Sequence, residues 1–430
     1  MKIRVAYDIT SLLVEARNSE RKSGIYRVTE EVMYELNKRD DIELELAKIC
    51  AGNSLFDALN FSCYIKNEPC LATYKIVELL KSRLNVRSLY DEIYPIFSSE
   101  DFQKIPKLLP KAIIIRGIFK LLRLFDAYLY FDNNNFDIFH SPYHKLPSEE
   151  FTKDVPRLLT VHDIIPVATP ELIVPILIPY FKEILNSINH QKDWVVCNSE
   201  YTRQEFCEYT GMPLERTFVT PLAAANHFHL VTDSAQIATA RQRYGIPDGN
   251  YFLSVGTHLE PRKNLAHLIH CFLELLSEQP NLDVNLVLVG SKRHTTGETI
   301  NHPNFSRFSS RVVFTGYVDD EDLSAIYSGA TAFIYPSIYE GFGLPTLEAM
   351  RCGTPVITSN TTSLPEVVGD AGILVDPKDK DALCQAMLNI LTDSTLVQDL
   401  RQKGFARSQS FSWSKCAADT VEVYKLIANH

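Results

Sequence analysis

Short apolar runs alternate with longer helical patterns along most of this sequence, and that alternation restricts the fold more than any other feature. It is typical of βαβ units, in which helices cover a parallel sheet. In the first half, strands are expected at 3–7, 44–49, 138–140, 157–161 and 194–197. Helices are expected at 24–37 and 199–209, and Ser199 is the expected N-cap of the second.

The alternation is interrupted twice. Residues 52–135 are far longer than an ordinary crossover and have a helical character, so we interpret them as an insertion. Residues 220–232 carry no regular pattern and are the predicted interdomain linker. Beyond the linker, strands are expected at 251–255, 285–289, 312–314, 332–335, 356–358 and 372–374. The helices expected there are 265–278, 321–328, 346–351, 365–368, 380–391 and 413–428.

A chain of 430 residues exceeds what one hydrophobic core usually serves. We therefore expect an α/β protein with two Rossmann-like domains facing across a cleft. The predicted domains are 1–225, with the insertion at about 52–135, and 226–410. A separate C-terminal helix is predicted at 411–430.

Composition excludes several classes of protein. Apolar residues make up 45% of the chain and charged residues 22%, which is ordinary for a globular protein. The formal net charge of −10 argues against a general nucleic-acid-binding protein. The N-terminus lacks the pattern of a signal peptide, and none of the nine cysteines has CxxC spacing. We expect reduced cysteines in a cytoplasmic protein.

No apolar run reaches the ~18–20 residues that a membrane-spanning helix needs. Residues 172–180 come close, but Pro170, Pro175 and Pro179 interrupt them, so we interpret the run as a buried or cleft-lining loop. Residues 111–125 form a basic amphipathic pattern with two interpretations. The segment either contacts an anionic membrane surface or is a helix buried in the N-terminal domain.

A glycine-rich turn after the expected strand at 332–335 carries the strongest chemical signal. Glu340 stands in this turn, and Glu348 follows on a helix that Thr346 can cap. The turn itself is Gly341, Phe342, Gly343 and Leu344. Ligands of open α/β sheets bind at the carboxyl ends of strands, and free amides at a helix N-terminus hold phosphate or hydroxyl oxygens. The alternative is a tight turn whose acidic residues only favour the helix.

Three other segments stand at expected strand ends. Arg262 and Lys263 are adjacent cations, which suit a diphosphate, although a solvated basic pair is the alternative. Gly24 opens the first helix without a GxGxxG pattern, which argues against a nicotinamide cofactor. His162 ends a strand, where it is either functional or structural.

The triplet Asp320-Glu321-Asp322 resembles a metal-binding Asp-x-Asp motif. Its surroundings fit the acidic first turn of a helix better. We therefore expect no metal.

These residues together resemble the retaining family-4 glycosyltransferases of GT-B fold. Glu340 and Glu348 match the family's glutamate–seven residues–glutamate motif, and 256–264 resembles its diphosphate-binding loop. Shorter matches lie at 316–318, 352–357, 363–367 and 372–377. The resemblance is looser at 1–36 and 157–225, and 52–135 matches nothing recognisable.

The resemblance implies three catalytic residues. Glu340 contacts hydroxyls of the donor sugar with the Gly341–Gly343 amides, Lys263 stabilises the departing diphosphate, and His162 faces the reacting sugar. The mechanism implied is a front-face displacement, in which the leaving phosphate accepts the acceptor's proton.

The resemblance also implies further donor contacts. Glu348 holds the ribose, and Gly24 faces the phosphates. Thr257 stands where many members have arginine, so Arg262 is expected to take over part of that role.

The implied function is transfer of a hexose, which we interpret as mannose, from a GDP- or UDP-linked sugar to a glycan or lipid-linked acceptor in polysaccharide or glycoconjugate biosynthesis. The domain at 1–225 then binds the acceptor, 226–410 binds the nucleotide sugar, and 411–430 packs back on the N-terminal domain. No cofactor is implied, and the location is the cytoplasm, at the inner membrane face if 111–125 binds lipid. The alternatives are a GT-B epimerase or phosphorylase and a non-catalytic nucleotide-sugar-binding subunit.

Overall fold

The computed structural model describes residues 2–15, 23–47, 74–76, 80–81, 128–129, 136–256, 260–290 and 303–430. The chain divides into two compact units. The first unit comprises Met1–Thr160, Ile184–Val195 and Val421–His430, and the second comprises Val161–Glu183 and Val196–Thr420. The predicted helix at 111–125 and Thr257 lie outside the described residues.

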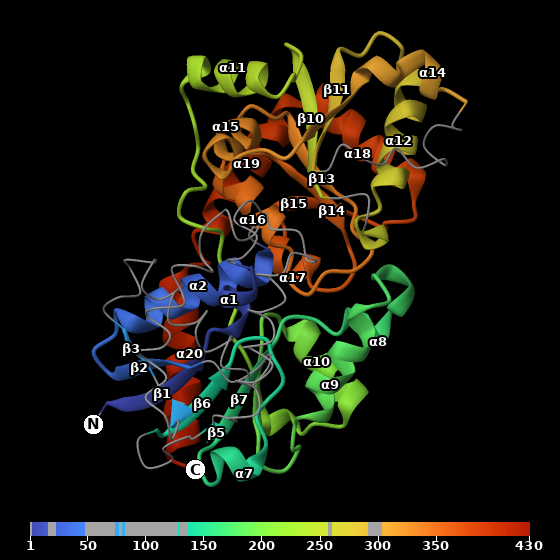
Figure 1. The fold of residues 1–430 in the computed structure, drawn as a ribbon. Helices are drawn as coiled ribbons and strands as arrows, with labels where there is room; N and C mark the ends of the chain where they lie inside the picture. The colour runs from blue at the N-terminus through green and yellow to red at the C-terminus, as the bar shows by residue number, and fades with distance from the viewer. Residues whose placement is uncertain are drawn as a thin grey trace, which may run out of the picture. The chain divides into compact units, whose positions relative to one another are not determined.

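A seven-stranded sheet has the order β3-β2-β1-β6-β7-β8-β9 (Figure 1). Its strands are β1 (Ile3–Asp8), β2 (Ile42–Ala47), β3 (Lys75–Ile76), β6 (Ile138–Ser141), β7 (Arg157–Val161), β8 (Trp194–Cys197) and β9 (Thr217–Val219). β1 pairs in parallel with β2 on one side and with β6 on the other. Its last four residues are buried, as expected for a parallel strand covered on both faces.

The helices between β1 and β9 are α1 (Thr10–Glu15), α2 (Gly24–Asn37), α7 (Glu149–Thr152), α8 (Ile165–Ala168), α9 (Leu177–Asn186) and α10 (Glu200–Thr210). Of these, α8, α10 and the first turns of α9 belong to the second unit. The predicted bounds of α2 are confirmed. Its buried residues include Val28, Val32 and Leu36, which recur at helical spacing, and Ser23 caps it by accepting from Tyr26 N at 3.2 Å. A two-stranded pair, β4 (Leu80–Lys81) and β5 (Tyr128–Leu129), lies within the predicted insertion.

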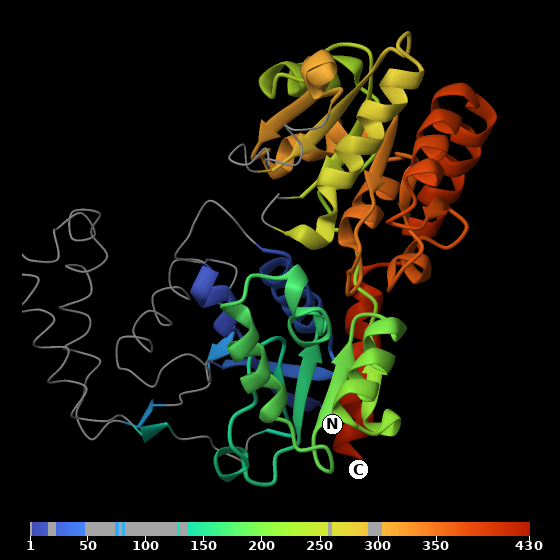
Figure 2. The same ribbon diagram turned by 90° about the vertical axis from the view of Figure 1, so that its right-hand side faces the viewer.

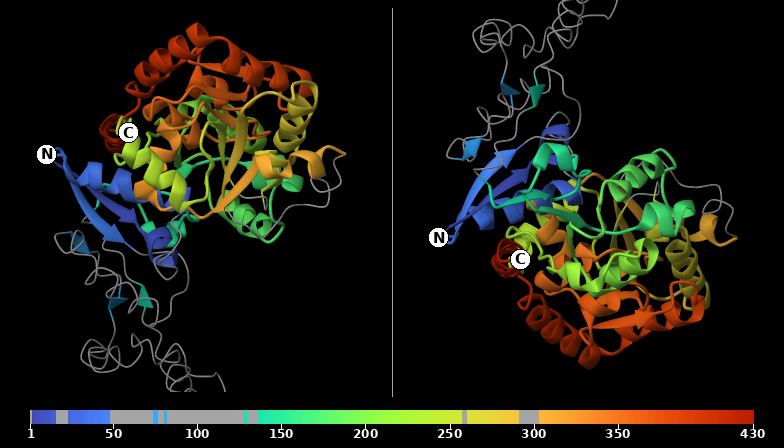
Figure 3. Two further views of the ribbon diagram at one scale, coloured as in Figure 1. Left: turned by 90° about the horizontal axis from the view of Figure 1, so that it is seen from above. Right: turned by 90° about the horizontal axis from the view of Figure 1, so that it is seen from below.

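The C-terminal helix α20 (Trp413–Ala428) has the predicted bounds, and its last turns belong to the first unit. Tyr424 OH lies 2.6 Å from His140 Nδ1, at the end of β6. Lys425 Nζ lies 3.3 Å from Asp41 Oδ2, just before β2. These turns run beside the strands of the first unit in Figures 1 and 3.

The second unit contains a six-stranded parallel sheet in the order β12-β11-β10-β13-β14-β15. Its strands are β10 (Asn250–Val255), β11 (Val284–Val289), β12 (Val312–Gly316), β13 (Ala332–Tyr335), β14 (Val356–Ser359) and β15 (Gly372–Val375). Its helices are α11 (Ser234–Arg243), α12 (Leu265–Glu278), α14 (Phe305–Phe308), α15 (Asp320–Ser328), α16 (Leu344–Arg351), α17 (Leu364–Val368), α18 (Lys380–Thr392) and α19 (Ser394–Ser408).

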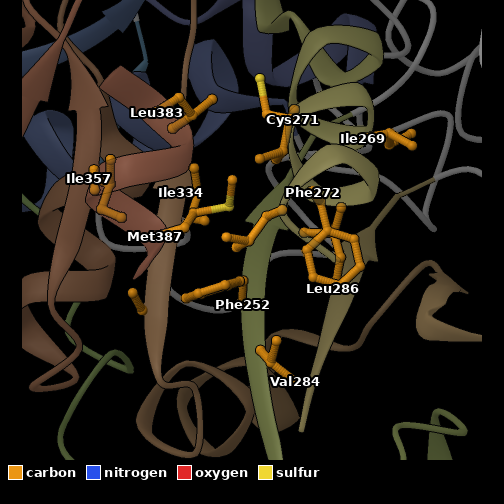
Figure 4. Close-up of a cluster of buried hydrophobic side chains, with 14 of the residues drawn as sticks. Phe252, Ile269, Cys271, Phe272, Val284, Leu286, Ile334, Ile357, Leu383 and Met387 are labelled. Carbon is orange, nitrogen blue, oxygen red and sulfur yellow. The ribbon is translucent and has the colours of Figure 1, made fainter. Parts of the chain in front are cut away.

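An apolar cluster of the second unit fills one face of this sheet, under α12 and α18. Phe252, Leu286 and Ile334 point there from neighbouring strands and meet Phe272 and Met387 from the helices (Figure 4). Figure 2 shows α12 running along the strands. On the other side of the sheet from α12, α16 contacts β13 and β14 (Figure 1), so the sheet has helices on both faces. Both predicted bounds of α12 are confirmed.

Several sequence expectations differ from the structure. The strand expected at 44–49 is β2 at Ile42–Ala47, because Ile42 pairs with Ile3 at the start of β1. The helices α11 and α19 were not expected. In α19 the buried residues are only Leu400, Gly404 and Ser408, so the sequence shows no apolar stripe.

Residues 172–180 were expected to form a buried or cleft-lining loop; the loop is wrong from residue 177 onward, and burial is wrong as well. α9 begins at Leu177 and includes Pro179, which is tolerated because the first turn of a helix needs no backbone N–H bond. Ile176 is 79% exposed and Val174 is 49% exposed. The linker at 220–232 contains no helix or strand, and the domain boundary near 225 stays a prediction.

We expect the core under α12 to dominate the stability of the second unit. Phe272→Ala removes a fully buried ring and should lower the free energy of unfolding by about 3–5 kcal/mol. Phe405→Ala, at a ring that is 45% exposed, is the control and should cost far less. Urea unfolding followed by circular dichroism measures both, and equal losses would contradict the assigned core.

Candidate active site

Glu340, in the loop between β13 and α16, is the centre of a buried ion cluster in the second unit. Its Oε1 lies 2.8 Å from Lys263 Nζ and 2.6 Å from Arg262 Nη1. The hydroxyls of Tyr335 and Ser337 each donate to the same oxygen at 2.7 Å. Lys263 Nζ also donates to Tyr335 OH and lies 4.7 Å from the centre of that ring. Two cations and two hydroxyls thus satisfy one buried carboxylate oxygen.

The charges of this cluster shift one another's ionisation. Burial opposes the charge on Glu340, but Arg262 and Lys263 outweigh it and lower its pKa to about 2. Burial lowers the pKa of Lys263, and the neighbouring Arg262 adds to this effect. The pKa of Arg262 is raised above its ordinary value by Glu340, although burial opposes that shift. Glu340 is therefore ionised at any physiological pH.

The sheet order explains why these distant residues meet. β10 and β13 are parallel neighbours, so their carboxyl ends open on the same edge. Arg262 and Lys263 follow β10 in a 3-10 turn (Pro261–Lys263), and Glu340 follows β13. Asn264 ends the turn in the left-handed conformation, at φ 57°. Its Nδ2 donates to Pro336 O at 3.1 Å, which ties the turn to the Glu340 loop.

Two glycines let the loop approach its neighbours. A Cβ on Gly341 would lie 2.0 Å from the carbonyl oxygen of His162 and 2.9 Å from Asp163 Cβ. The structure thus places His162 directly against the glycine after Glu340. Gly343 has φ +100° and is the N-cap of α16, which begins at Leu344. The expectation that Thr346 caps this helix is wrong, because its hydroxyl donates to Gly343 O at 2.7 Å from inside the helix.

In the part of the chain that the structure describes, the contact given for the Glu348 carboxylate is with Tyr327 and not with the ion cluster. Glu348 is half-buried on α16, and its Oε2 accepts from Tyr327 OH at 3.1 Å. Phe342 is buried beside Gly341, with its ring 5.9 Å from that of Phe411. Gly24 belongs to the first unit, at the start of α2, and a Cβ there would meet nothing within 4 Å.

Sequence reasoning missed three residues around Glu340. Tyr335 is the last residue of the expected strand at 332–335, and Ser337 follows it before the turn, so the sequence predicts no contact of either with Glu340. Asp163 follows His162; burial raises its pKa, and the nearby Arg262 opposes that shift. Only its position directly after His162 could have pointed to it.

The Asp-x-Asp triplet has structural contacts. Asp320 and Asp322 stand in the first turn of α15, and Asp322 Oδ2 accepts from Arg243 at 2.7 Å and from Tyr244 OH at 2.8 Å. Across the described ranges, no group of three acidic, histidine or cysteine residues could hold a metal ion. Nor does any described helix have the length and hydropathy to cross a bilayer.

Two family models match the chain. The one described as Glycosyl transferases group 1 matches residues 249–393, and the one described as Glycosyltransferase Family 4 matches residues 90–223. The crystal structure of a glycosyltransferase from Rickettsia africae superposes with a TM-score of 0.64 at 17% identity, covering 99% of this chain and 98% of that one. WaaG, a glycosyltransferase involved in lipopolysaccharide biosynthesis, gives 0.60 at 14% identity, covering 98% and 99%. The fold is therefore GT-B, as predicted.

Two relatives of this chain from Escherichia coli are named as mannosyltransferases. O-antigen chain mannosyltransferase B of Escherichia coli is 34% identical over 291 residues, which cover 67% of this chain and 74% of the relative. The serotype-specific mannosyltransferase WbdA of Escherichia coli is 32% identical over 288 residues, which cover 64% of this chain and 35% of that longer protein. The protein is a glycosyltransferase with the GT-B fold. It belongs to the retaining glycosyltransferase family 4.

The ion cluster should stabilise the fold in a pH-dependent way. Because the pKa of Glu340 falls from its ordinary 4.5 to about 2 on folding, its contribution is present above pH 4.5 and is lost as the pH falls toward 2. Glu340→Gln should therefore cost about 2 kcal/mol less at pH 3 than at pH 6.

Urea unfolding of both proteins at the two pH values measures this difference. Glu215→Gln, at an exposed glutamate, should give the same small effect at both pH values. An equal cost of Glu340→Gln at pH 3 and pH 6 would mean that the carboxylate is not held by the two cations.

Proposed function

We propose that this glycosyltransferase transfers mannose from a nucleotide diphosphate sugar to a glycan or lipid-linked acceptor in polysaccharide or glycoconjugate biosynthesis. The donor proposed is GDP-linked, with a UDP-linked sugar as the other case. The mannosyltransferase names of the relatives support the sugar. The buried cluster around Glu340 carries the proposal, because it combines a fixed carboxylate with two cations at a strand edge.

Glu340 is proposed to hold the donor sugar. The four donors described above all contact Oε1, so we assign Oε2 to the sugar hydroxyls. The amides of Gly341 to Gly343 and the side chain of His162 complete this part of the site. A carboxylate with a pKa of about 2 does not take up a proton at neutral pH, so its role is to accept hydrogen bonds.

Lys263 and Arg262 are proposed to hold the diphosphate. As the glycosidic bond breaks, negative charge grows on the leaving phosphate, and a fixed cation stabilises that state more than the bound donor. The lysine is 8% exposed, so little water weakens its charge. Gly24 is proposed to face the same phosphates, and Glu348 to hold the ribose. The leaving phosphate accepts the acceptor's proton, so no side chain has to act as base.

Donor turnover tests the function directly. The full chain is incubated with GDP-mannose, GDP-fucose, UDP-glucose and UDP-galactose, with and without mannose-terminated oligosaccharide, and released nucleoside diphosphate is measured. We expect GDP release from GDP-mannose that the acceptor accelerates. Conversion of the sugar without GDP release would indicate an epimerase. A thermal shift with GDP but no turnover of any donor would indicate a non-catalytic binding subunit.

The two glutamates should fail differently. Glu340→Gln should lower kcat by about 100-fold at saturating donor, because the lost contact matters most as the glycosidic bond breaks. Glu348→Gln should raise the donor KM more than it lowers kcat, because the ribose changes little during reaction.

Steady-state kinetics and calorimetric GDP binding measure both effects in variants that keep the wild-type circular dichroism spectrum. Glu321→Gln, at an exposed glutamate of α15, is the control and should change neither constant. A reversed pattern would mean that the two roles are assigned to the wrong residues.

A further inference from the structure

The start of α10 holds the loop that carries Glu340. Ser199 Oγ donates to the carbonyl oxygen of Gly341 at 2.7 Å, and Thr202 Oγ1 donates to the same oxygen at 3.1 Å. Both side chains are buried. Because Gly341 directly follows Glu340, these two bonds fix one side of the loop.

Glu205 binds the side chain of Tyr339, the residue before Glu340. The hydroxyl of Tyr339 donates to Glu205 Oε2, and the hydroxyl of Tyr201 donates to Oε1 at 3.2 Å. Ser199, Thr202 and Glu205 are three residues apart, so they lie on one face of the helix. That face therefore contacts the residue before Glu340 and the residue after it.

The N-terminus of α10 is itself hydrogen-bonded to Glu366 of α17. The carboxylate of Glu366 accepts from the backbone N–H of Glu200 at 2.9 and 3.0 Å and of Tyr201 at 3.3 Å, where an anion suits the free amides of a helix N-terminus. Ser363, the N-cap of α17, donates its hydroxyl to the carbonyl oxygen of Glu340 at 2.9 Å. The loop that carries Glu340 is thus held by residues at the starts of α10 and α17, and these two helices are hydrogen-bonded to each other.

We propose that Glu205 is a positioning residue, which orients Glu340 toward the donor sugar through its hydrogen bond with Tyr339. This inference rests on the proposed role of Glu340. Burial raises the pKa of Glu205, with the nearby Asp163 and Glu208 adding to the shift, so keeping a carboxylate here opposes stability. The hydroxyls of Tyr201 and Tyr339 both donate hydrogen bonds to this carboxylate.

A double-mutant cycle on kcat tests the proposal. Glu205→Leu and Tyr339→Phe each remove one partner of the same bond, so each should lower kcat about tenfold, and the double variant should be no slower than either one. The donor KM and GDP affinity should change less than about twofold, because Glu340 is not assigned to the nucleotide. Glu205→Gln keeps an oxygen that can accept from Tyr339 and should retain most of the activity.

Amide hydrogen exchange of residues 337–343 gives a readout that needs no turnover. Glu205→Leu and Tyr339→Phe should both speed exchange in this segment, and Glu208→Leu, at an exposed position one turn along α10, should leave it unchanged. Additive losses of kcat, or unchanged exchange in both variants, would overturn the proposal. A wild-type protein without turnover of any donor would instead refute the proposed function, and the exchange experiment would still decide whether Glu205 positions the loop.

Discussion

The buried carboxylate of Glu340 and its two cations impose the constraint on which the rest of this site depends. Removing three charged groups from water is costly, and only close, well-satisfied geometry compensates for it. Lys263 at 2.8 Å and Arg262 at 2.6 Å provide that geometry. The turn after β10 and the loop after β13 must therefore keep a fixed position relative to each other. The parallel pairing of the two strands holds them there.

The surroundings of this cluster follow from the same requirement. Gly341 has no Cβ, because one would lie 2.0 Å from the carbonyl oxygen of His162. Ser199 and Thr202 then bind the carbonyl oxygen of Gly341, and Asn264 ties the cationic turn to Pro336. Each contact limits how far the loop can move. A cluster built this way has its charges oriented in advance, which is the condition for strong electrostatic stabilisation and the reason why we propose it as the donor site.

Sequence patterns predicted elements well where periodicity and end signals agreed. The bounds of α2, α12 and α20 are confirmed, and α12 carries an apolar stripe along its length. Prediction failed where one signal misled. Pro179 was interpreted as a break, yet it falls in the first turn of α9, where its missing N–H costs nothing. α19 was missed because it buries few residues and so leaves no periodic pattern.

The sequence by itself determined the α/β class, the alternation of elements and the two separate motifs that contain Glu340 and the Arg262–Lys263 pair. These are local properties, because the periodicity of a strand or helix and the composition of a loop can be recognised within a short segment of sequence. The tertiary structure alone decided that Lys263, 77 residues before Glu340, shares one oxygen of that carboxylate with Arg262, and that Ser199 binds Gly341 across 142 residues. Such contacts depend on strand order and helix placement, which no short segment specifies.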